Sequence, residues 1–389
     1  MTSFGRAVAW SMGHCYPAAT GYPTIIMART QSAAAVPGGQ THFDYRMPAE
    51  WEPHEATWIA WPHHRDDWPG KFPAIPFVYG EIVRHLHQSE KVHILINGTA
   101  GEKRARQGLE KLPLDWRRII FWKAPTNRVW TRDYGPMIVH DGSGTRTIIE
   151  WRFNAWAKYP NCQRDRAVAF SLYRQLTGEI YHEAAIQDGT HVVLEGGAID
   201  VNGQGCVLTT EECLLSKVQQ RNPGFARKDY EQVFARYLGA AKTLWLGKGI
   251  VGDDTHGHID DLARFVAPRI VAVAVEENPK DENYKPLQEN LERLRGMTDQ
   301  DGKKLEVVKL PMPAPVWWEG QRLPASYANF YIANDRVLVP TFNDANDRRA
   351  LGILTELFPK RAVIGIHAVD LVWGLGTLHC LTQQLPAAK

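Results

Sequence analysis

The stretch Met137-Ile-Val-His-Asp-Gly-Ser-Gly-Thr-Arg-Thr-Ile-Ile149 decides the fold class, because it holds two apolar runs separated by Asp-Gly. Asp-Gly between strand-like runs is a strong local signal for a β-hairpin, since both residues tolerate the positive φ angles of a tight turn. Similar hairpin signals recur at residues 198–208, 263–273 and 329–339. These turns are spaced by roughly 60–65 residues, a period that indicates an internal repeat.

Each hairpin is followed by a segment with helical periodicity and then by an apolar strand-like run. The predicted helices are residues 164–176, 228–238, 286–294 and 347–357. The predicted strands after them are residues 192–194, 243–246, 305–310 and 361–366. The same pattern in the N-terminal part predicts a strand at 57–61, a helix at 77–87 and a strand at 91–96.

The repeating unit is therefore ββαβ, and the predicted units begin near Thr57, Met137, Ala198, Ala263 and Asn329. A partial sixth start near residue 378 would complete the first unit and close a ring. We expect an α/β fold of five such units around an axis, with pseudo-fivefold symmetry. Residues 44–389 would form this single catalytic domain, and residues 1–43 a flexible N-terminal arm rich in small residues.

Composition restricts the possible partners. The 389 residues carry a formal net charge of +2, which argues against nucleic acid or an anionic membrane as the main partner. No apolar run is long enough to span a bilayer. The five cysteines are an odd number without a CxxC pair, so we expect free thiols and a cytoplasmic location.

The most informative polar residues stand directly before the first strand of a unit or before the closing strand. They are Asp133 after Trp130-Thr-Arg, Glu195 before Gly-Gly, His258 and Asp260 in Gly257-His-Ile-Asp260, Asn329, and Cys380 in Leu378-His-Cys-Leu-Thr-Gln-Gln384. Equivalent loops of radial repeats converge on the axis, so we expect these side chains to meet there.

Three acids, a histidine and a cysteine at one place suit a planar cation. Two carboxylates, Asp133 and Asp260, can bracket a guanidinium group with charge-assisted hydrogen bonds. The thiolate of Cys380 could then attack the central carbon, while His258 protonates the leaving nitrogen and later deprotonates water. Glu195 would orient His258. This chemistry is hydrolysis of a C–N bond with release of ammonia.

Other interpretations of the same residues remain open. Cys380 could be an inert buried cysteine, Asp133 could simply pair with Arg132, and Glu195 could sit in a turn. A metal-dependent hydrolase is a further alternative, since His-x-His-x-Asp supplies suitable ligand types. Its ligands would be His256, His258 and Asp260, with His54, His63, His64 and His367 available as additional ones.

Several motifs together resemble the agmatine deiminases of the guanidino-group-modifying superfamily, which also includes bacterial peptidylarginine deiminases. They are Met47-Pro-Ala-Glu-Trp-Glu-Pro-His54, Trp130-Thr-Arg-Asp-Tyr-Gly-Pro136, Leu194-Glu-Gly-Gly197, Leu208-Thr-Thr-Glu-Glu-Cys-Leu-Leu215, Gly257-His-Ile-Asp260, Ala325-Ser-Tyr-Ala-Asn-Phe-Tyr331 and the Cys380 segment. The resemblance extends from about Met47 to Pro386.

The resemblance implies a five-bladed α/β propeller and deimination of agmatine to N-carbamoylputrescine through an amidino-thioether on Cys380. His258 would be the general acid and base, Glu195 its support, and Asp133 and Asp260 the guanidinium ligands, with Trp130 and Asn329 also contacting substrate. It implies a small-molecule guanidine substrate and no metal or organic cofactor. Such enzymes are often homo-oligomers, but this sequence does not fix the oligomeric state.

Two points qualify the resemblance. The run Gly374-Leu-Gly376 replaces a longer glycine run in the family, which keeps a catalytically inactive guanidine-binding protein as an alternative. A peptidylarginine or other guanidine deiminase is another, although no secretion signal is evident. We also expect the neighbouring carboxylates to raise the pKa of Cys380, and a bound cation to lower it again.

Overall fold

The computed structural model describes residues 45–186 and 188–388. These residues belong to one compact unit, Phe43–Lys389. The predicted flexible arm, residues 1–43, lies outside the described residues. Within the described part of the chain, no helix has both the length and the apolar composition needed to cross a membrane.

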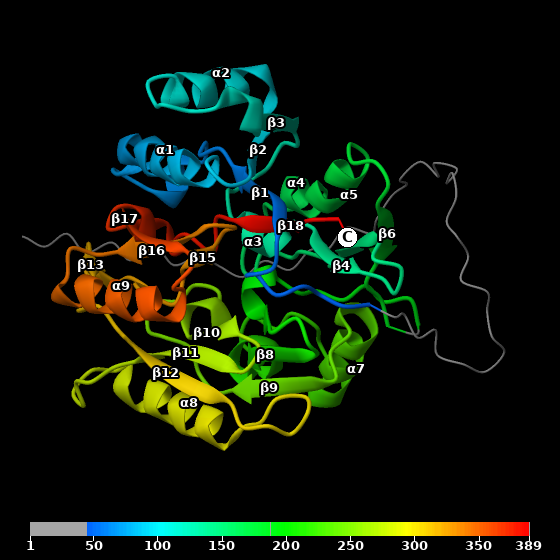
Figure 1. Ribbon diagram of the computed structural model, residues 1–389, viewed down its shortest axis with the longest axis vertical. Helices are drawn as coiled ribbons and strands as arrows, with labels where there is room; N and C mark the ends of the chain where they lie inside the picture. The colour runs from blue at the N-terminus through cyan, green and yellow to red at the C-terminus, as the bar shows by residue number, and fades with distance from the viewer. Residues whose placement is uncertain (1–44, 187, 389) are drawn as a thin grey trace, which may run out of the picture. The chain divides into compact units, whose positions relative to one another are not determined.

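The structure is a mixed α/β fold with five sheets that share one internal order (Figure 1). In each of them an antiparallel pair is followed by a parallel pair, and a helical segment connects the two parallel strands. Parallel neighbours need such a crossover, because a tight turn cannot reverse the chain direction twice. The ββαβ unit expected from the sequence is confirmed.

The bounds of these elements follow the chain. The first sheet contains β18 (Gln383–Pro386), β1 (His54–Ala60), β2 (Lys91–Ile96) and β3 (Ile119–Lys123), with helices α1 (Ile75–Leu86) and α2 (Gly98–Leu109). The second contains β4 (Met137–His140), β5 (Arg146–Glu150) and β6 (Ile180–Glu183), with α3 (Thr131–Tyr134) before it and α4 (Gln163–Arg166) and α5 (Val168–Tyr173) within it. The third contains β7 (Asp200–Val201), β8 (Cys206–Thr210) and β9 (Lys242–Leu246), with α6 (Glu211–Leu215) and α7 (Arg227–Leu238).

The fourth sheet contains β10 (Ala263–Ala267), β11 (Ile270–Val275) and β12 (Glu306–Pro311), with α8 (Tyr284–Gly296). The fifth contains β15 (Tyr331–Ile332), β16 (Arg336–Thr341) and β17 (Ala362–His367), with α9 (Ala345–Leu357). A short hairpin of β13 (Trp317–Trp318) and β14 (Gln321–Arg322) lies between these two sheets in the sequence.

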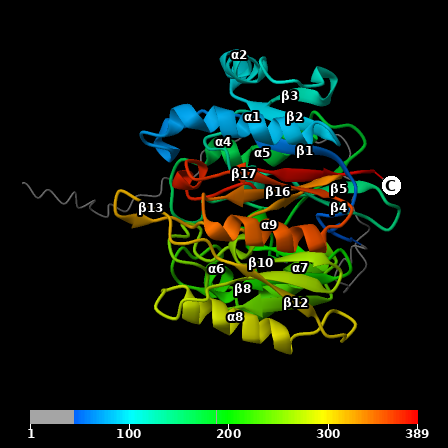
Figure 2. The same cartoon turned by 60° about the vertical axis from the view of Figure 1, so that its left-hand side comes forward.

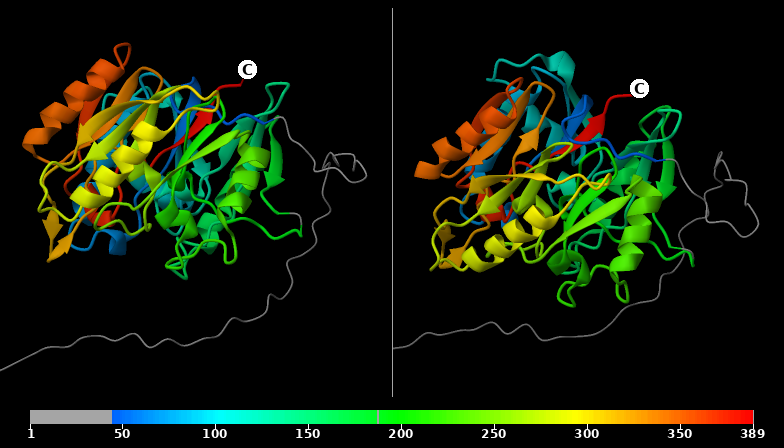
Figure 3. Two further views of the ribbon diagram at one scale, coloured as in Figure 1. Left: turned by 90° about the horizontal axis from the view of Figure 1, so that it is seen from below. Right: turned by 60° about the horizontal axis from the view of Figure 1, so that its bottom comes forward.

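The two ends of the described chain meet in the first sheet. Strand β18 pairs antiparallel with β1, with Thr57 opposite Gln384 and Trp58 opposite Gln383. Figure 3 shows β18 in red beside the blue strand β1. The C-terminal segment therefore supplies the first strand of the first ββαβ unit, which confirms the expected completion of that unit.

Crossover helices pack both on their own sheet and on the sheet before it. Helix α8 contacts β11 and β12 as well as β9, α9 contacts β17 as well as β12, and α1 contacts β2 as well as β17. Figure 2 shows α1, α9 and α8 in successive rows with their sheets behind them. Each helix thus closes one interface between neighbouring units, and it buries its apolar face there.

Three details of the sequence analysis were wrong or incomplete. The third strand of the second unit is β6, not residues 192–194, where Val193 forms an isolated bridge with Arg152. The closing strand begins at Gln383 rather than near residue 378. Helix α2 and strand β3, which extend the first sheet, were not predicted, because this addition has no counterpart in the other units.

Candidate active site

The polar residues singled out in the sequence lie in short segments at the start of the ββαβ units. Asp133 lies on α3, Glu195 directly precedes a 3-10 helix at Gly196–Ala198, and His258 precedes another at Ile259–Asp261. These three segments contact one another in sequence order, α3 with the first 3-10 helix and the first with the second. The repeat therefore places equivalent loops at one shared location.

Cys380 is buried, and its sulfur has two polar neighbours. Asn329 Nδ2 lies 3.1 Å from Sγ, and Asp260 Oδ2 lies 3.7 Å from it. The carbonyl of Cys380 accepts a hydrogen bond from the backbone N–H of Arg132 at 3.1 Å, which ties the segment to α3. Burial and the charges of Asp260, Asp261 and Asp133 raise the pKa of the Cys380 thiol well above its usual value, and the hydrogen bond from Asn329 opposes this.

Asp133 is held by two donors and is completely enclosed. Its Oδ1 accepts a hydrogen bond from the backbone N–H of Gly197 at 3.1 Å, and its Oδ2 accepts one from Trp156 Nε1 at 2.9 Å. Burial raises the pKa of Asp133 to about 6, because it outweighs the attraction of His258, and the charges of Asp260 and Glu195 act in the same direction as burial. Its carboxyl group would ionise readily beside a cation.

His258 lies between two carboxylates. Its Nδ1 is 3.8 Å from Asp133 Oδ1, and its Nε2 is 3.8 Å from Glu195 Oε2. Burial lowers the pKa of His258, but Asp133, Cys213 and Glu195 outweigh it and raise the pKa well above the usual value. The imidazole is therefore favoured in its protonated form when the site holds no cation.

Glu195 forms a buried ion pair with Arg221, whose Nε lies 3.0 Å from Glu195 Oε1. Both side chains are inaccessible to solvent. Burial would raise the pKa of Glu195, but Arg221 and His258 lower it to about 2. Glu195 thus stays ionised beside His258, and its second oxygen, Oε2, has no hydrogen-bond partner.

Asp260 joins the site to a buried charge network. His379 places Nδ1 2.7 Å from Asp260 Oδ2 and Nε2 2.8 Å from Glu50 Oε2, so both bonds form when both ring nitrogens carry hydrogen. Glu50 also pairs with Arg132 at 3.1 Å and with Arg264 at 2.9 Å. This network holds Asp260 in place through the contact of its Oδ2 with His379. The other carboxylate oxygen, Asp260 Oδ1, has no hydrogen-bond partner.

A cavity of about 250 Å³ leads to Cys380 and Asp133. Aromatic rings form much of its wall, from Trp130, Trp156 and Trp373. Charged residues also line it. They are Asp66, Asp67 and Asp254 together with His64 and Arg128. Arg128 pairs with Asp67, and Asp254 pairs with Lys158 and accepts a hydrogen bond from Tyr159 at 2.7 Å.

Glycine is required at two positions around these side chains. A Cβ at Gly197 would lie 2.5 Å from His258 Nδ1 and 2.9 Å from Asp133 Oδ1. A Cβ at Gly376 would lie 2.8 Å from the Trp130 ring and 3.2 Å from Cys380 Cβ. At each position at least one of these distances is below 3.0 Å, which is too short for a real Cβ, so the Gly-Gly and Gly-x-Gly runs allow the backbone to approach the site closely.

All seven site residues proposed from the sequence lie at or beside this cavity. Asp133, Trp130 and Cys380 line it, Asn329 and Asp260 contact Cys380, and His258 and Glu195 adjoin Asp133. Leu375, in the altered glycine run, also lines the cavity and adopts φ +67°, a conformation that glycine would adopt more readily.

The proposed metal set of His256, His258 and Asp260 is not brought together. His256 Nε2 instead contacts Ser216 Oγ at 3.0 Å. Within the described ranges, the three-residue group whose ligand atoms are close enough for a metal ion is Glu195, Cys213 and His258. The sequence analysis had assigned no role to Cys213.

Trp156, Arg221, His379 and Glu50 were also missed as parts of the site. Glu50 and His379 lie within two of the motifs that carry the family resemblance, and this position could have indicated a role in the site. Trp156 and Arg221 come from loops outside the repeated pattern, so nothing local to their positions indicated a role.

The profile of the Porphyromonas-type peptidyl-arginine deiminase family matches residues 46–386. The chain belongs to this family. A Selenomonas ruminantium protein that is named "Putative agmatine deiminase" is 37% identical to this chain over 369 residues. The match covers 89% of this chain and 96% of that protein.

Two solved structures of relatives are similar over most of the chain. The agmatine deiminase of Enterococcus faecalis is 34% identical with a TM-score of 0.79, and the match covers 89% of this chain and 97% of that one. A variant of the C. jejuni agmatine deiminase with substrate bound is 28% identical with a TM-score of 0.78, covering 88% and 97%. The expected resemblance to the agmatine deiminases is confirmed.

Proposed function

We propose that the protein hydrolyses agmatine to N-carbamoylputrescine and ammonia. The observation that carries this proposal is the position of Cys380 Sγ on a cavity wall, 3.7 Å from Asp260 and in the same lining as Asp133. Two carboxylates around one sulfur suit a flat cation whose central carbon is the electrophile. The relatives named agmatine deiminase support the same assignment.

In the first half of the reaction, Asp133 and Asp260 hold the guanidinium group and Cys380 attacks its carbon. As the cation binds, the thiol gives up its proton to water in the cavity, and the resulting thiolate forms a C–S bond to the guanidinium carbon. His258 donates a proton to the departing nitrogen, and the C–N bond breaks to release ammonia. The product of this half is an amidino-thioether on Cys380. The positive charge of the substrate lowers the pKa of the thiol, which offsets the effect of the carboxylates around it.

In the second half, water enters where ammonia left. His258, now neutral, accepts a proton from water as its oxygen bonds to the same carbon. The C–S bond then breaks, the remaining hydroxyl proton passes to the sulfur as the carbonyl forms, and the carbamoyl product leaves with the Cys380 thiol and protonated His258 restored. Glu195 and its partner Arg221 keep His258 oriented through both halves. No metal and no organic cofactor takes part.

The lining of the cavity favours agmatine over arginine. Agmatine carries a second positive charge at its far end, whereas free arginine carries an α-carboxylate there. The lining contains Asp66, Asp67 and Asp254; Asp67 is paired with Arg128 and Asp254 with Lys158, so Asp66 supplies the remaining negative charge. A distal ammonium is therefore attracted, and a carboxylate would be repelled by Asp66.

The finer architectural and cellular expectations remain part of this proposal. We propose that the five sheets are the blades of a five-bladed α/β propeller, that residues 44–389 are its single catalytic domain, and that its loops meet at the substrate. The contacts of helices α1, α8 and α9 with the preceding sheet support the ring. A cytoplasmic location, the absence of nucleic acid and membrane partners, and a homo-oligomeric state are further predictions.

The test is a comparison of three substrates with the full-length protein. Agmatine, arginine and an arginine peptide are incubated separately, and ammonia and the carbamoyl product are quantified. We expect kcat/KM for agmatine to exceed that for the others by about 100-fold or more. The variant Cys380→Ala should be inactive, and Cys206→Ala, a buried cysteine in β8, should retain activity. Absence of ammonia from agmatine would overturn the proposal.

A further inference from the structure

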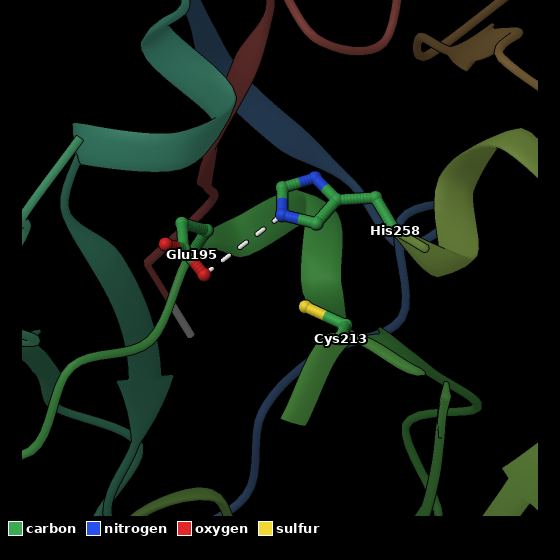
Figure 4. Close-up of side chains that lie close together, drawn as sticks. All are labelled: Glu195, Cys213 and His258. Atoms are coloured by element: carbon green, nitrogen blue, oxygen red, sulfur yellow. Dashed lines mark ion pairs between the residues drawn. The ribbon is translucent and has the colours of Figure 1, made fainter. Parts of the chain in front are cut away.

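Cys213 lies on α6 directly against the imidazole of His258 and the carboxylate of Glu195, and no step of the proposed reaction uses it. Figure 4 shows its sulfur, a ring nitrogen of His258 and an oxygen of Glu195 turned toward one another. One ligand atom from each residue lies within 4.8 Å of the other two. Nε2 of His258 is 3.8 Å from Oε2 of Glu195.

These ligand atoms are buried and available. Cys213 is inaccessible to solvent, and the side chains of His258 and Glu195 are at most 1% exposed. Neither ring nitrogen of His258 has a hydrogen bond, and neither has Glu195 Oε2. These atoms form ion pairs at 3.8 Å but no hydrogen bonds, and buried polar atoms without hydrogen bonds are unfavourable, so their convergence leaves a place for a ligand. Arg221 occupies the other oxygen of Glu195, which leaves Oε2 directed at the cluster.

The cluster is held in place by its own surroundings. Thr210 Oγ1 accepts a hydrogen bond from the N–H of Cys213 at 3.0 Å and donates one to the carbonyl of Gly257 at 2.5 Å. Glu212 Oε2 accepts a bond from the N–H of Gly249 at 2.6 Å. The start of α6 is thus fastened to the loop that carries His258, so the backbone holds the two residues side by side and closing onto an ion requires only side-chain adjustment.

We propose that Glu195, Cys213 and His258 form a zinc site, and that bound Zn²⁺ reversibly blocks turnover by occupying His258. Thiolate, imidazole and carboxylate are typical zinc ligands, whereas Mg²⁺ and Ca²⁺ prefer oxygen ligands alone. In a tetrahedral site the ligand atoms are roughly 3.4–3.6 Å apart, so atoms that lie within 4.8 Å of one another need to close by at most about 1.2–1.4 Å. A fourth position remains for water.

The remaining contacts suit a bound metal. A histidine that binds a metal through one nitrogen usually donates its other N–H to a carboxylate, and Asp133 Oδ1 lies 3.8 Å from Nδ1 of His258. Asp133 also lines the substrate cavity, so the cluster lies one side chain away from that cavity. The inhibitory part of this inference rests on the proposed function of His258, while the binding part does not.

The first test measures binding with metal alone. Chelator-treated protein is titrated with Zn²⁺ against a chromophoric chelator, and with Co²⁺ while the near-ultraviolet sulfur-to-cobalt band is recorded. We expect one equivalent and the band in the wild type, in Cys206→Ala and in Cys380→Ala. In Cys213→Ala the affinity should fall by about 100-fold or more and the band should be absent.

The second test measures inhibition. Zn²⁺ should reduce ammonia release from agmatine by the wild type and by Cys206→Ala, and a chelator should restore it, while Cys213→Ala and Cys213→Val should tolerate about 100-fold more zinc. The inference is overturned if no stoichiometric binding occurs, or if the band survives in Cys213→Ala and disappears in Cys380→Ala. If the protein fails to turn over agmatine, the proposed function is overturned, but the metal-binding test still decides whether the zinc site exists.

Discussion

The side-chain nitrogen of Asn329 lies 3.1 Å from the sulfur of Cys380, and it also lies 3.0 Å from Asp261 Oδ1. The same amide accepts hydrogen bonds through its oxygen from Thr377 Oγ1 at 2.7 Å and from the N–H of His379 at 3.0 Å. These acceptor bonds fix the orientation of the amide, so that it presents a hydrogen-bond donor to the sulfur. The donor opposes the increase in the thiol pKa that burial and the acids cause.

The first prediction concerns this donor. Asn329→Asp keeps the size and the acceptor oxygen but replaces the donor with a carboxyl group beside Cys380. We expect kcat with agmatine to fall by about 100-fold or more, because thiolate formation is opposed. Iodoacetamide labelling of Cys380 should require a higher pH than in the wild type. A matched control is Asn346→Asp, which lies on α9 away from the cavity. Unchanged labelling in Asn329→Asp would contradict the assigned role.

The second prediction concerns the close approach of the backbone at Gly197. Gly197→Ala introduces a Cβ that would lie 2.5 Å from His258 Nδ1 and 2.9 Å from Asp133 Oδ1. We expect kcat/KM to fall by about 100-fold, since displacements of about 1 Å in an active site have effects of this size.

The control for this change is Gly352→Ala on α9, where a Cβ would meet no atom within 4 Å. It should leave kcat/KM unchanged and stabilise the protein by up to about 1 kcal/mol, because alanine favours a helix. Both variants are compared by steady-state kinetics and thermal unfolding. Full activity in Gly197→Ala would show that the site is less tightly packed than described.

The third prediction concerns the buried pair of Glu195 and Arg221. The pKa of Glu195 is lowered from 4.5 to about 2, so its ionised form stabilises the fold by about 3 kcal/mol. Because the folded-state pKa is depressed, this contribution is complete above about pH 4.5 and is lost as the pH falls toward 2. At neutral pH the pair is fully charged.

Glu195→Gln and Arg221→Met each leave one buried charge without its partner. We expect each to lower the free energy of unfolding by about 3–5 kcal/mol at pH 7, and the double variant to lose less than the sum of the two. Urea denaturation at pH 7 measures the three values. Additive losses would mean that the two side chains stabilise the fold independently.

The fourth prediction concerns the pH dependence of turnover. The pKa of Asp133 is raised to about 6 in the free site, and a protonated Asp133 cannot attract the guanidinium group. Since kcat/KM reports ionisation of the free enzyme, we expect it to fall as the pH drops below about 6, approaching tenfold per pH unit. Asp133→Asn should reduce kcat/KM throughout and remove this acidic limb. A flat profile down to pH 5 in the wild type would contradict the proposed role of Asp133.

Much of the fold was readable in the sequence because each unit carries its own local signals. Asp-Gly and Asn-Gly turns between apolar runs predicted the hairpins that became β4–β5 and β7–β8. The third strand of the second unit was misplaced, because residues 180–183, Ile-Tyr-His-Glu, are exposed or only partly buried and form too short an apolar run for a strong strand pattern. Helix α2 and strand β3 were missed, since a repeat predicts what recurs and not what one unit adds.

The sequence by itself determined the repeat and the order of the units, and it predicted the candidate site residues in the segments before their first strands. Periodicity and turn chemistry are local properties, so they are visible without the fold. Tertiary structure alone decided that His379 and Glu50 form the network behind Asp260, that Arg221 pairs with Glu195, and that Cys213 lies against His258. Those contacts join residues from distant parts of the chain, and their energies depend on burial and distance, which a linear pattern does not contain.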